Sequence, residues 1–406
     1  MLREAFDPRA NSIGFLRWLL AFAVIFSHAG PLAGFYGGHD LGSQISSEQS
    51  LGGVAVAGFF FFSGFLITLS RMGKSTIFRY FWRRALRIFP AFWLVLLFTA
   101  FLFAPIAWVL ETGSIDGYWD APRESPFTYF LANFTLDLGQ RNIAEGGSTL
   151  PYAMIHGGYD WNGSAWTLEY EFFAYVIVGG LGLVGVLAYR WAVTAFAGLI
   201  LVLNAAQWSG AGDVAAWYPG FGDPFLLMFL GPFAFGMLFA VWQDHIPIDD
   251  RLASAALLLA CASYAVGGWN IWGMFMFAYF LMWFAIRATK LQHWEKRGDL
   301  SYGIYLFAWP LMQLGAAAGL HHLGWFVYHL VIVVAAHLFA FASWHLIEKP
   351  AMSLKNWTPK GLRVVLDRWV DPAWNRIADR LVDPRFSSTP RTSRMRRDAA
   401  AQEVAP

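Results

Sequence analysis

Two ionisable residues, Arg17 and His28, lie within the first apolar stretch of the chain, Ser12 to Gly30. At about 100° per residue, their separation amounts to roughly three full turns of an α-helix, so both side chains project from one face, about 16 Å apart along the axis. A charge inside a bilayer costs from about 3 kcal/mol upward and usually faces a partner or a cavity. The pair therefore predicts a functional cavity within a helix bundle. The alternative is an Arg and a His that each extend toward one membrane surface.

A cluster of arginines follows the second apolar stretch, between Arg71 and Pro90. Arg84 and Arg87 are three residues apart, which places them on one face of a helix. No Asp or Glu lies in this segment, so a phosphorylated ligand is the expected counter-ion of the two guanidinium groups. The alternative is the ordinary excess of positive charge on the inner membrane side, where arginines contact lipid headgroups.

Small and acidic residues in other apolar segments supply further candidates. Ser63 and Gly64 interrupt an aromatic run, and Gly64 either lets two helices pack closely or lets a ligand approach the backbone. Glu171 lies near the start of a later stretch, at the depth expected for His28, so we expect its carboxylate to be the partner of that imidazole. The alternative for Glu171 is a favourable interaction with a helix N-terminus.

The composition places the chain in a membrane. Of its 406 residues, 57% are hydrophobic and only 14% are charged, and the mean hydropathy is +0.45. A soluble protein carries about 25% charged residues. The single Cys261 excludes an internal disulfide, and no group of residues has metal-ligand spacing, so we expect no metal site. No nucleic-acid partner is expected.

Ten apolar windows are long enough to cross a bilayer. They are Ser12–Pro31, Gly52–Ser70, Ile88–Leu110, Ser164–Tyr189, Trp191–Trp208, Pro224–Trp242, Leu252–Gly267, Ile271–Ile286, Leu300–Leu320 and Leu323–Ile347. The expected fold class is therefore an all-α integral membrane bundle of about ten transmembrane helices. With the N-terminus inside, only Arg123 and Arg141 of the 29 Lys and Arg residues lie outside, so both termini are expected in the cytoplasm.

Two regions are expected along the chain: a membrane domain at 1–350 and a cytoplasmic tail at 351–406. The tail is expected to form an amphipathic helix on the membrane surface and then a disordered end. The main external feature is a loop from Glu111 to about Gly163. Within it, the apolar segment 125–136 is too short to cross the membrane and is expected to be re-entrant or interfacial.

Several segments, taken in their order, resemble the acyltransferase 3 family of integral-membrane acyltransferases. The resemblance is spread over most of the chain. It rests on Arg17 and His28 with ten residues between them, Phe59–Gly64, Arg83–Pro90, Trp166–Tyr175, Ser301–Leu306 and His345–Pro350. Each segment is weak evidence alone, whereas their order within a ten-span layout is much more specific.

The resemblance implies transfer of an acyl group, commonly acetyl, from cytoplasmic acyl-CoA to a hydroxyl of a glycan or lipid-linked saccharide. It also implies a multi-pass protein of the bacterial inner membrane. It assigns catalytic roles to His28, Arg17 and Glu171. Acyl-CoA binding is assigned to Arg84, Arg87, Arg83, Ser63 and Gly64. Substrate-binding or structural roles are assigned to Trp166, Asn162, Tyr305 and Glu348.

One position departs from the family pattern, since Ala308 stands where relatives often have a His. The mechanism we expect has His28 accept the proton of the acceptor hydroxyl as that hydroxyl attacks the thioester. An acyl-His28 intermediate is the two-step alternative. A transporter or flippase for a lipid-linked sugar or an anion is the rival from another class, and a scaffold without chemistry is the third possibility.

Overall fold

The structure is a computed structural model that describes residues 1–357, except 74–75, 212–213, 215–222 and 295–297. The predicted amphipathic helix and disordered end of the tail lie outside the described residues. The described part is helical and contains no β-strand, only one isolated bridge between Asp7 and Ala10. The expectation of an all-α fold is confirmed for these residues.

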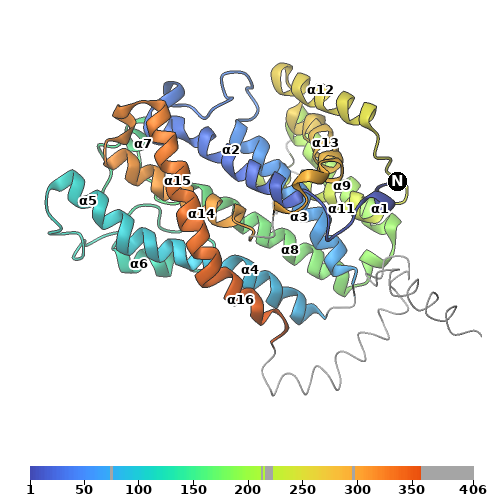
Figure 1. The fold of residues 1–406 in the computed structure, drawn as a ribbon, viewed down its shortest axis with the longest axis horizontal. Coiled ribbons are helices and arrows are strands. Elements are labelled where there is room, and N and C mark those ends of the chain that lie inside the picture. The colour runs from blue at the N-terminus through green and yellow to red at the C-terminus, as the bar shows by residue number, and fades with distance from the viewer. Residues whose placement is uncertain (74–75, 212–213, 215–222, 295–297, 358–406) are drawn as a thin grey trace, which may run out of the picture.

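Figure 1 shows the longer helices running side by side as a bundle. They are α2 (Ile13–Ala33), α3 (Leu51–Arg71), α4 (Ile77–Phe98), α8 (Thr167–Leu183), α9 (Arg190–Ser209), α11 (Pro224–Val241), α12 (Asp250–Val266), α13 (Met274–Arg287), α14 (Ser301–Ala317) and α15 (Trp325–Ser343). The short helices are α1 (Leu2–Ala5), α5 (Ala104–Thr112), α6 (Pro126–Ala132), α7 (Pro151–His156) and α16 (Lys349–Ser353). Three π-helical segments adjoin them: η2 (Thr99–Phe103), η6 (Trp269–Gly273) and η10 (Trp344–Glu348).

Each of the ten apolar windows coincides with one of the longer helices. Within the described residues, six helical stretches are long and apolar enough to cross a membrane: Ile13–Ala33, Leu51–Arg71, Ile77–Thr112, Arg190–Ser209, Trp269–Arg287 and Trp325–Asn356. The other four windows hold α8, α11, α12 and α14, which have 17 or 18 residues and lie at the short end of the range that spans a bilayer. The chain is therefore a multi-pass membrane protein. The count of ten and the side of the termini stay predictions.

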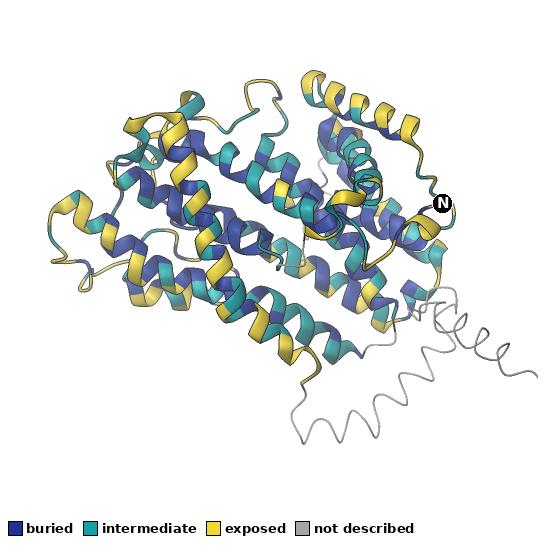
Figure 2. Ribbon diagram, viewed as in Figure 1, coloured by how far each residue is buried: buried dark blue, intermediate teal, exposed yellow. Residues whose placement is uncertain are grey.

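Helix α14 forms the centre of the bundle, because its residues are buried without interruption from Ser301 to Gln313. It packs against α2 and α15, and α2 packs in turn against α3. Helices α12 and α15 have exposed faces (Figure 2). On α15 the exposed side chains recur at helical spacing and are apolar: Phe326, Leu330, Val334 and Leu338. In a bilayer such a face contacts lipid.

Helix α4 begins earlier than the sequence predicts. The apolar window of this region starts at Ile88, yet α4 begins at Ile77, after Thr76 as its N-cap. Hydropathy detects the apolar length of a helix and misses its polar first turns, so the window starts later than the helix. Arg84 and Arg87 therefore lie on a helix that continues into the membrane, three residues apart, as their spacing predicts.

Candidate active site

His28 lies near the end of α2 and bonds to an aspartate of the following loop. Its Nδ1 is 2.7 Å from Oδ1 of Asp40, and the hydroxyl of Ser27 donates to the same oxygen at 3.1 Å. A carboxylate can only accept, so Nδ1 is assigned the proton. The other ring nitrogen, Nε2, has no hydrogen-bond partner within the part of the chain that the structure describes. Its lone pair is therefore available to accept a proton from a bound molecule.

The loop that carries Asp40 folds back onto α2 because the helix ends in small residues. Helix α2 ends at Gly34, which has a left-handed backbone with φ of 76°. The loop then returns over Gly30, where a Cβ atom would lie only 1.7 Å from the carbonyl oxygen of His39. Any residue larger than glycine at this position would displace the loop and, with it, the carboxylate beside His28.

Asp40, and not Glu171, is the partner of His28. The expectation that Glu171 would bond this imidazole is wrong: its Oε1 accepts hydrogen bonds from Ser63 at 2.8 Å and Tyr175 at 2.5 Å. Burial alone would raise the pKa of Asp40, but the adjacent imidazole and two hydrogen bonds lower it below the ordinary value. Asp40 is therefore an ionised partner that orients the His28 ring.

Trp309 of α14 covers one side of His28. The two rings meet edge to face, with centroids 4.9 Å apart. The indole is itself fixed, because its Nε1 donates to the carbonyl of Asp160 at 2.7 Å and its ring packs over Gly163. Trp309 directly follows Ala308, the position at which this chain departs from the family pattern. His28 thus faces the aromatic ring of Trp309, and the adjacent position 308 lacks the histidine of the family pattern.

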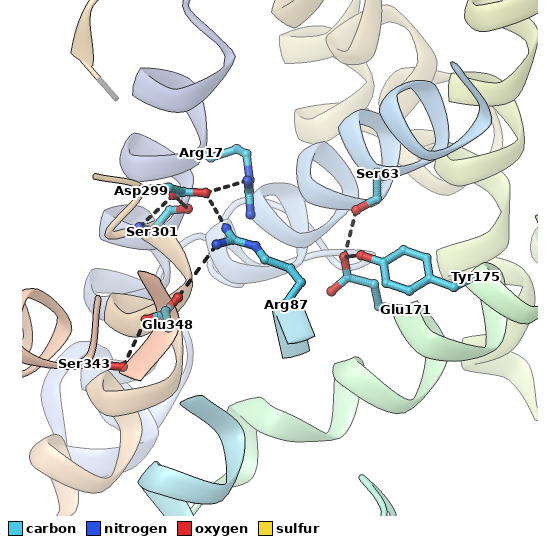
Figure 3. Close-up of polar contacts among 9 residues, drawn as sticks. All are labelled: Arg17, Ser63, Arg87, Glu171, Tyr175, Asp299, Ser301, Ser343 and Glu348. Carbon is cyan, nitrogen blue, oxygen red and sulfur yellow. Dashed lines mark hydrogen bonds and ion pairs between the residues drawn. The ribbon is translucent and has the colours of Figure 1, made fainter. Parts of the chain in front are cut away.

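A second polar group surrounds Arg17 (Figure 3). Its Nη1 is 2.8 Å from Oδ2 of Asp299, and Arg87 bonds to the same oxygen. Arg87 also lies 3.7 Å from Oε2 of Glu348. None of these four side chains is more than 25% exposed. Two cations and two anions thus balance one another in a largely buried network that joins α2, α4, η10 and the residues before α14.

The charge of Arg87 is balanced by acidic residues from other parts of the chain, although its own segment contains no acidic residue. The argument that the arginine cluster needs a phosphorylated ligand is wrong for this residue, because Asp299 and Glu348 arrive from distant parts of the chain. Donor binding by Arg87 stays a prediction, and it requires one of these contacts to open. Glu348 also accepts a hydrogen bond from Ser343 at 2.9 Å, so Arg87 rather than Lys349 is its basic partner.

Arg84 has no acidic partner among the described residues. Its guanidinium lies 5.9 Å from the centre of the Tyr175 ring, and its Nε is buried without a hydrogen-bond acceptor. Arg83, one residue earlier, donates to Oδ1 of Asn356 at 3.2 Å. Unlike Arg87, Arg84 therefore has a charge that a bound anion can neutralise.

A narrow cavity of only about 40 Å³ lies between α2, α3, α8 and α14. Its lining combines polar and aromatic side chains: Arg17, Val56, Phe59, Phe60, Ser63, Thr167, Leu168, Glu171, Ser301, Tyr302 and Tyr305. Figure 3 shows Ser63 and Tyr175 meeting at Glu171, opposite the Arg17 network. The cavity brings together Arg17, Ser63 and Glu171, whereas we predicted a cavity that Arg17 shares with His28. His28 is not part of this lining and lies about 16 Å farther along α2.

Gly64 faces α11. A Cβ atom on Gly64 would lie 2.0 Å from the carbonyl oxygen of Phe233, and one on Gly236 would lie 2.2 Å from the carbonyl oxygen of Phe61. The two helices thus touch backbone to backbone, which is the usual function of small residues in membrane helices. The structure favours helix packing as the reason for Gly64, and its predicted contact with the donor has no geometric support.

Three other predicted residues support the walls of the cavity. The hydroxyl of Tyr305 donates to a backbone carbonyl in the segment before α8, at 2.7 Å. Trp166 packs edge to face on Tyr170, 5.5 Å away, as their spacing predicts. Asn162 precedes the short helix η3 (Gly163–Trp166) as its N-cap residue, but its side chain makes no capping hydrogen bond and instead donates to the hydroxyl of Tyr129 at 2.6 Å.

Sequence reasoning missed the two aspartates that hold the site together, Asp40 and Asp299. A signal for both exists, since a buried Arg or His in a membrane helix needs a partner. Asp299 directly precedes the apolar window that starts at Leu300, and Asp40 lies in the loop nine residues after Pro31. Asp299 lies two residues before the Ser301–Leu306 segment of the family resemblance. Neither pairing could be assigned without the fold, because several other acidic residues border the windows equally closely.

The fold and its apolar helices define a multi-pass membrane protein with a largely buried polar network. A family described as an acyltransferase domain matches residues 11–345. The chain therefore belongs to the acyltransferase 3 family and is a membrane acyltransferase.

Two curated relatives match over most of their length. An O-acetyl transferase of Shigella phage Sf6 is 28% identical over 350 residues, which cover 84% of this chain and 96% of the relative. Nodulation protein 10 of Rhizobium leguminosarum bv. viciae is 28% identical over 373 residues, which cover 85% of this chain and 94% of the relative. No solved structure matches the chain.

Proposed function

We propose that this membrane acyltransferase moves an acyl group, in the simplest case acetyl, from acyl-CoA to a hydroxyl of a surface or exported glycan, with His28 as the general base. The observation that carries the proposal is the His28 imidazole, held through Nδ1 by Asp40 and unpartnered at Nε2 among the described residues. The family and the name of the phage O-acetyl transferase support acyl transfer to oxygen.

In this mechanism the acceptor hydroxyl gives its proton to Nε2 of His28 as its oxygen attacks the thioester carbonyl. The tetrahedral intermediate then collapses, the carbon–sulfur bond breaks, and the imidazolium returns the proton to the departing thiolate. Asp40 fixes the ring orientation and stabilises the imidazolium while it exists. The products are an ester on the acceptor and free CoA, so atoms and charges balance in a single transfer.

The donor enters from the opposite end of the bundle in this proposal. Arg84 neutralises a phosphate of CoA, with Arg83 beside it, because guanidinium groups match the geometry of phosphate oxygens. The extended thioester arm then passes Ser63 and Glu171 in the cavity on its way to His28. Arg17 lines that route, and its contact with Asp299 keeps its guanidinium beside the passage.

The proposed orientation places Arg84 at the cytoplasmic side and His28 at the external side of a bacterial inner membrane. The strong bias of Lys and Arg toward the segments expected inside supports it. Acyl-CoA, the acceptor glycan or lipid-linked saccharide, and the lipid bilayer are then the partners.

The proposal is tested with the purified full-length protein in lipid nanodiscs, acetyl-CoA labelled in the acetyl group, and oligosaccharides cut from alkali-treated surface polysaccharide as the acceptor. We expect release of free CoA, and His28→Ala lowers its rate by about 100- to 10,000-fold, the usual contribution of a positioned base. His39→Ala, an exposed histidine of the same loop directly before Asp40, is the matched control and keeps the wild-type rate. A His28→Ala variant with wild-type CoA release refutes the assignment of the base. Unchanged acetyl-CoA with the wild-type protein favours a transporter.

A further inference from the structure

Helix α7 of the predicted external loop lies against the end of α2 that carries His28 (Figure 1). Its position is fixed from two sides. Glu111, at the end of α5, accepts hydrogen bonds from the backbone of Gly147 at 2.8 Å and from the hydroxyl of Thr149 at 2.9 Å, just before α7 begins. On the other side, Ile155 packs on Gly38, where a Cβ atom would lie 2.9 Å from it.

Tyr152 and His156 of α7 extend the aromatic wall that begins beside His28. Trp309 is 4.9 Å from His28 and 5.5 Å from Tyr152, measured between ring centres. Tyr152 in turn lies 4.6 Å from His156, with the two rings tilted by 40°, and the His156 side chain is exposed. A continuous row of rings therefore runs from the proposed general base to the molecular surface, formed by two segments far apart in the sequence.

Polar groups border this row of rings. The hydroxyl of Tyr152 has no hydrogen-bond partner within the described chain, and burial raises the pKa of Tyr152 to about 12, so the hydroxyl stays a donor. Asp40 is 31% exposed, and only its Oδ1 is used by His28 and Ser27. Its other oxygen and the exposed His156 can bond to hydroxyl groups of a ligand.

A saccharide ring fits this combination of groups. Its axial C–H groups form an apolar face that packs on aromatic rings, while its edge carries hydroxyls that need donors and acceptors. We propose that Tyr152 and His156, together with Trp309, form the subsite that binds a saccharide ring of the acceptor and presents one of its hydroxyls to His28. This inference rests on the proposed function and names the residues that recognise the acceptor.

The experiment measures acceptor kinetics with the full-length protein in nanodiscs and labelled acetyl-CoA. The probe is a pool of oligosaccharides cut from the alkali-treated surface polysaccharide of cells that carry the gene. We expect Tyr152→Ala to raise the KM for these oligosaccharides about tenfold, the loss of roughly one stacking contact, while kcat and the KM for acetyl-CoA change by less than about twofold. Tyr152→Phe, which keeps the ring, has a smaller effect.

His156→Ala keeps the test decisive if Tyr152→Ala does not fold, because the His156 side chain is exposed and its loss does not open the core. We expect it also to raise the KM for the oligosaccharides. Met154→Ala is the matched control: Met154 lies on the same short helix, is 71% exposed, and is expected to change neither constant.

The outcomes separate this inference from the proposed function. If the wild-type protein shows no CoA release that depends on His28, the proposed function fails and the subsite fails with it. If release depends on His28 but the oligosaccharides accept no acetyl group, the saccharide class is wrong. If they are acetylated and both α7 variants keep the wild-type KM, the proposed function stands and the subsite is refuted.

Discussion

At the scale of single residues, the arrangement of Ser27, His28 and Asp40 assigns separate functions to neighbouring atoms. Asp40 holds Nδ1 of the imidazole, and the hydroxyl of Ser27 both donates to Asp40 and accepts the backbone N–H of Gly52 at 2.9 Å. These contacts fix the orientation of the imidazole ring and leave its Nε2 free to accept a proton in the proposed mechanism. The same logic applies in hydrolases in which a carboxylate orients a catalytic histidine.

Removing the charge of Asp40 tests this division of functions. We expect Asp40→Asn to lower kcat for acetyl transfer by about 100-fold or more, because a neutral amide no longer stabilises the imidazolium and no longer enforces the tautomer. The KM for acetyl-CoA should change little, since Asp40 is far from the arginines. Asp120→Asn, an exposed carboxylate of the predicted external loop, is the control. A wild-type kcat for Asp40→Asn shows that His28 does not depend on this partner.

At the scale of helices, the carboxylate of Asp299 is the contact that joins α2 to α4. It binds Arg17 and Arg87 from these two helices and is fixed by the backbone N–H of Ser301 at 3.2 Å. Burial would raise the pKa of Asp299, but the two guanidinium groups lower it well below the ordinary range. Its stabilising contribution is therefore present above the ordinary pKa of an aspartate and is lost only as the pH falls through the lower folded value.

We expect Asp299→Asn to lower the free energy of unfolding by about 3 kcal/mol or more, because it leaves two largely buried cations with one carboxylate between them. Thermal unfolding in detergent measures the effect as a lower Tm, and the difference from wild type should stay constant from about pH 5 to about pH 8. Asp244→Asn breaks an exposed pair with Arg3 and should cost at most about 1 kcal/mol. Equal Tm losses for both variants contradict a structural function for the buried network.

At the scale of the whole molecule, the proposed chemistry depends on opposite ends of one bundle facing opposite sides of the membrane. Arg84 lies in the first turns of α4, and His28 lies near the far end of α2, about 16 Å beyond Arg17. The cavity next to Arg17 lies between these two levels. A donor bound at one side can therefore meet an acceptor at the other only through the interior of the bundle.

Membrane topology is tested with single cysteines in a Cys261→Ala background. We expect Asp120→Cys to react with a membrane-impermeant maleimide in intact cells, because the predicted external loop carries few basic residues. Lys355→Cys should react only after the membrane is permeabilised, because the basic segments are expected in the cytoplasm. Labelling of Lys355→Cys in intact cells reverses the orientation and with it the proposed path of the donor.

The sequence by itself determined the membrane class, the helical content and the approximate positions of the long helices, because a bilayer demands continuous apolar lengths of a set size and these are visible locally. It also singled out Arg17 and His28, since ionisable residues in such lengths are costly. The sequence did not indicate where α4 begins, because polar helical turns outside the membrane resemble a loop.

Only the tertiary structure decided which partners these residues have. Asp40 meets His28 through a loop that folds back over Gly30, and Asp299 meets Arg17 and Arg87 across most of the chain length. Contacts of this kind depend on loop closure and on helix packing. The sequence alone does not indicate which carboxylate pairs with which cation, because a carboxylate can pair with any cation that lies close to it. The physical reason is that electrostatic pairing requires distance and burial, which are set by the folded bundle as a whole.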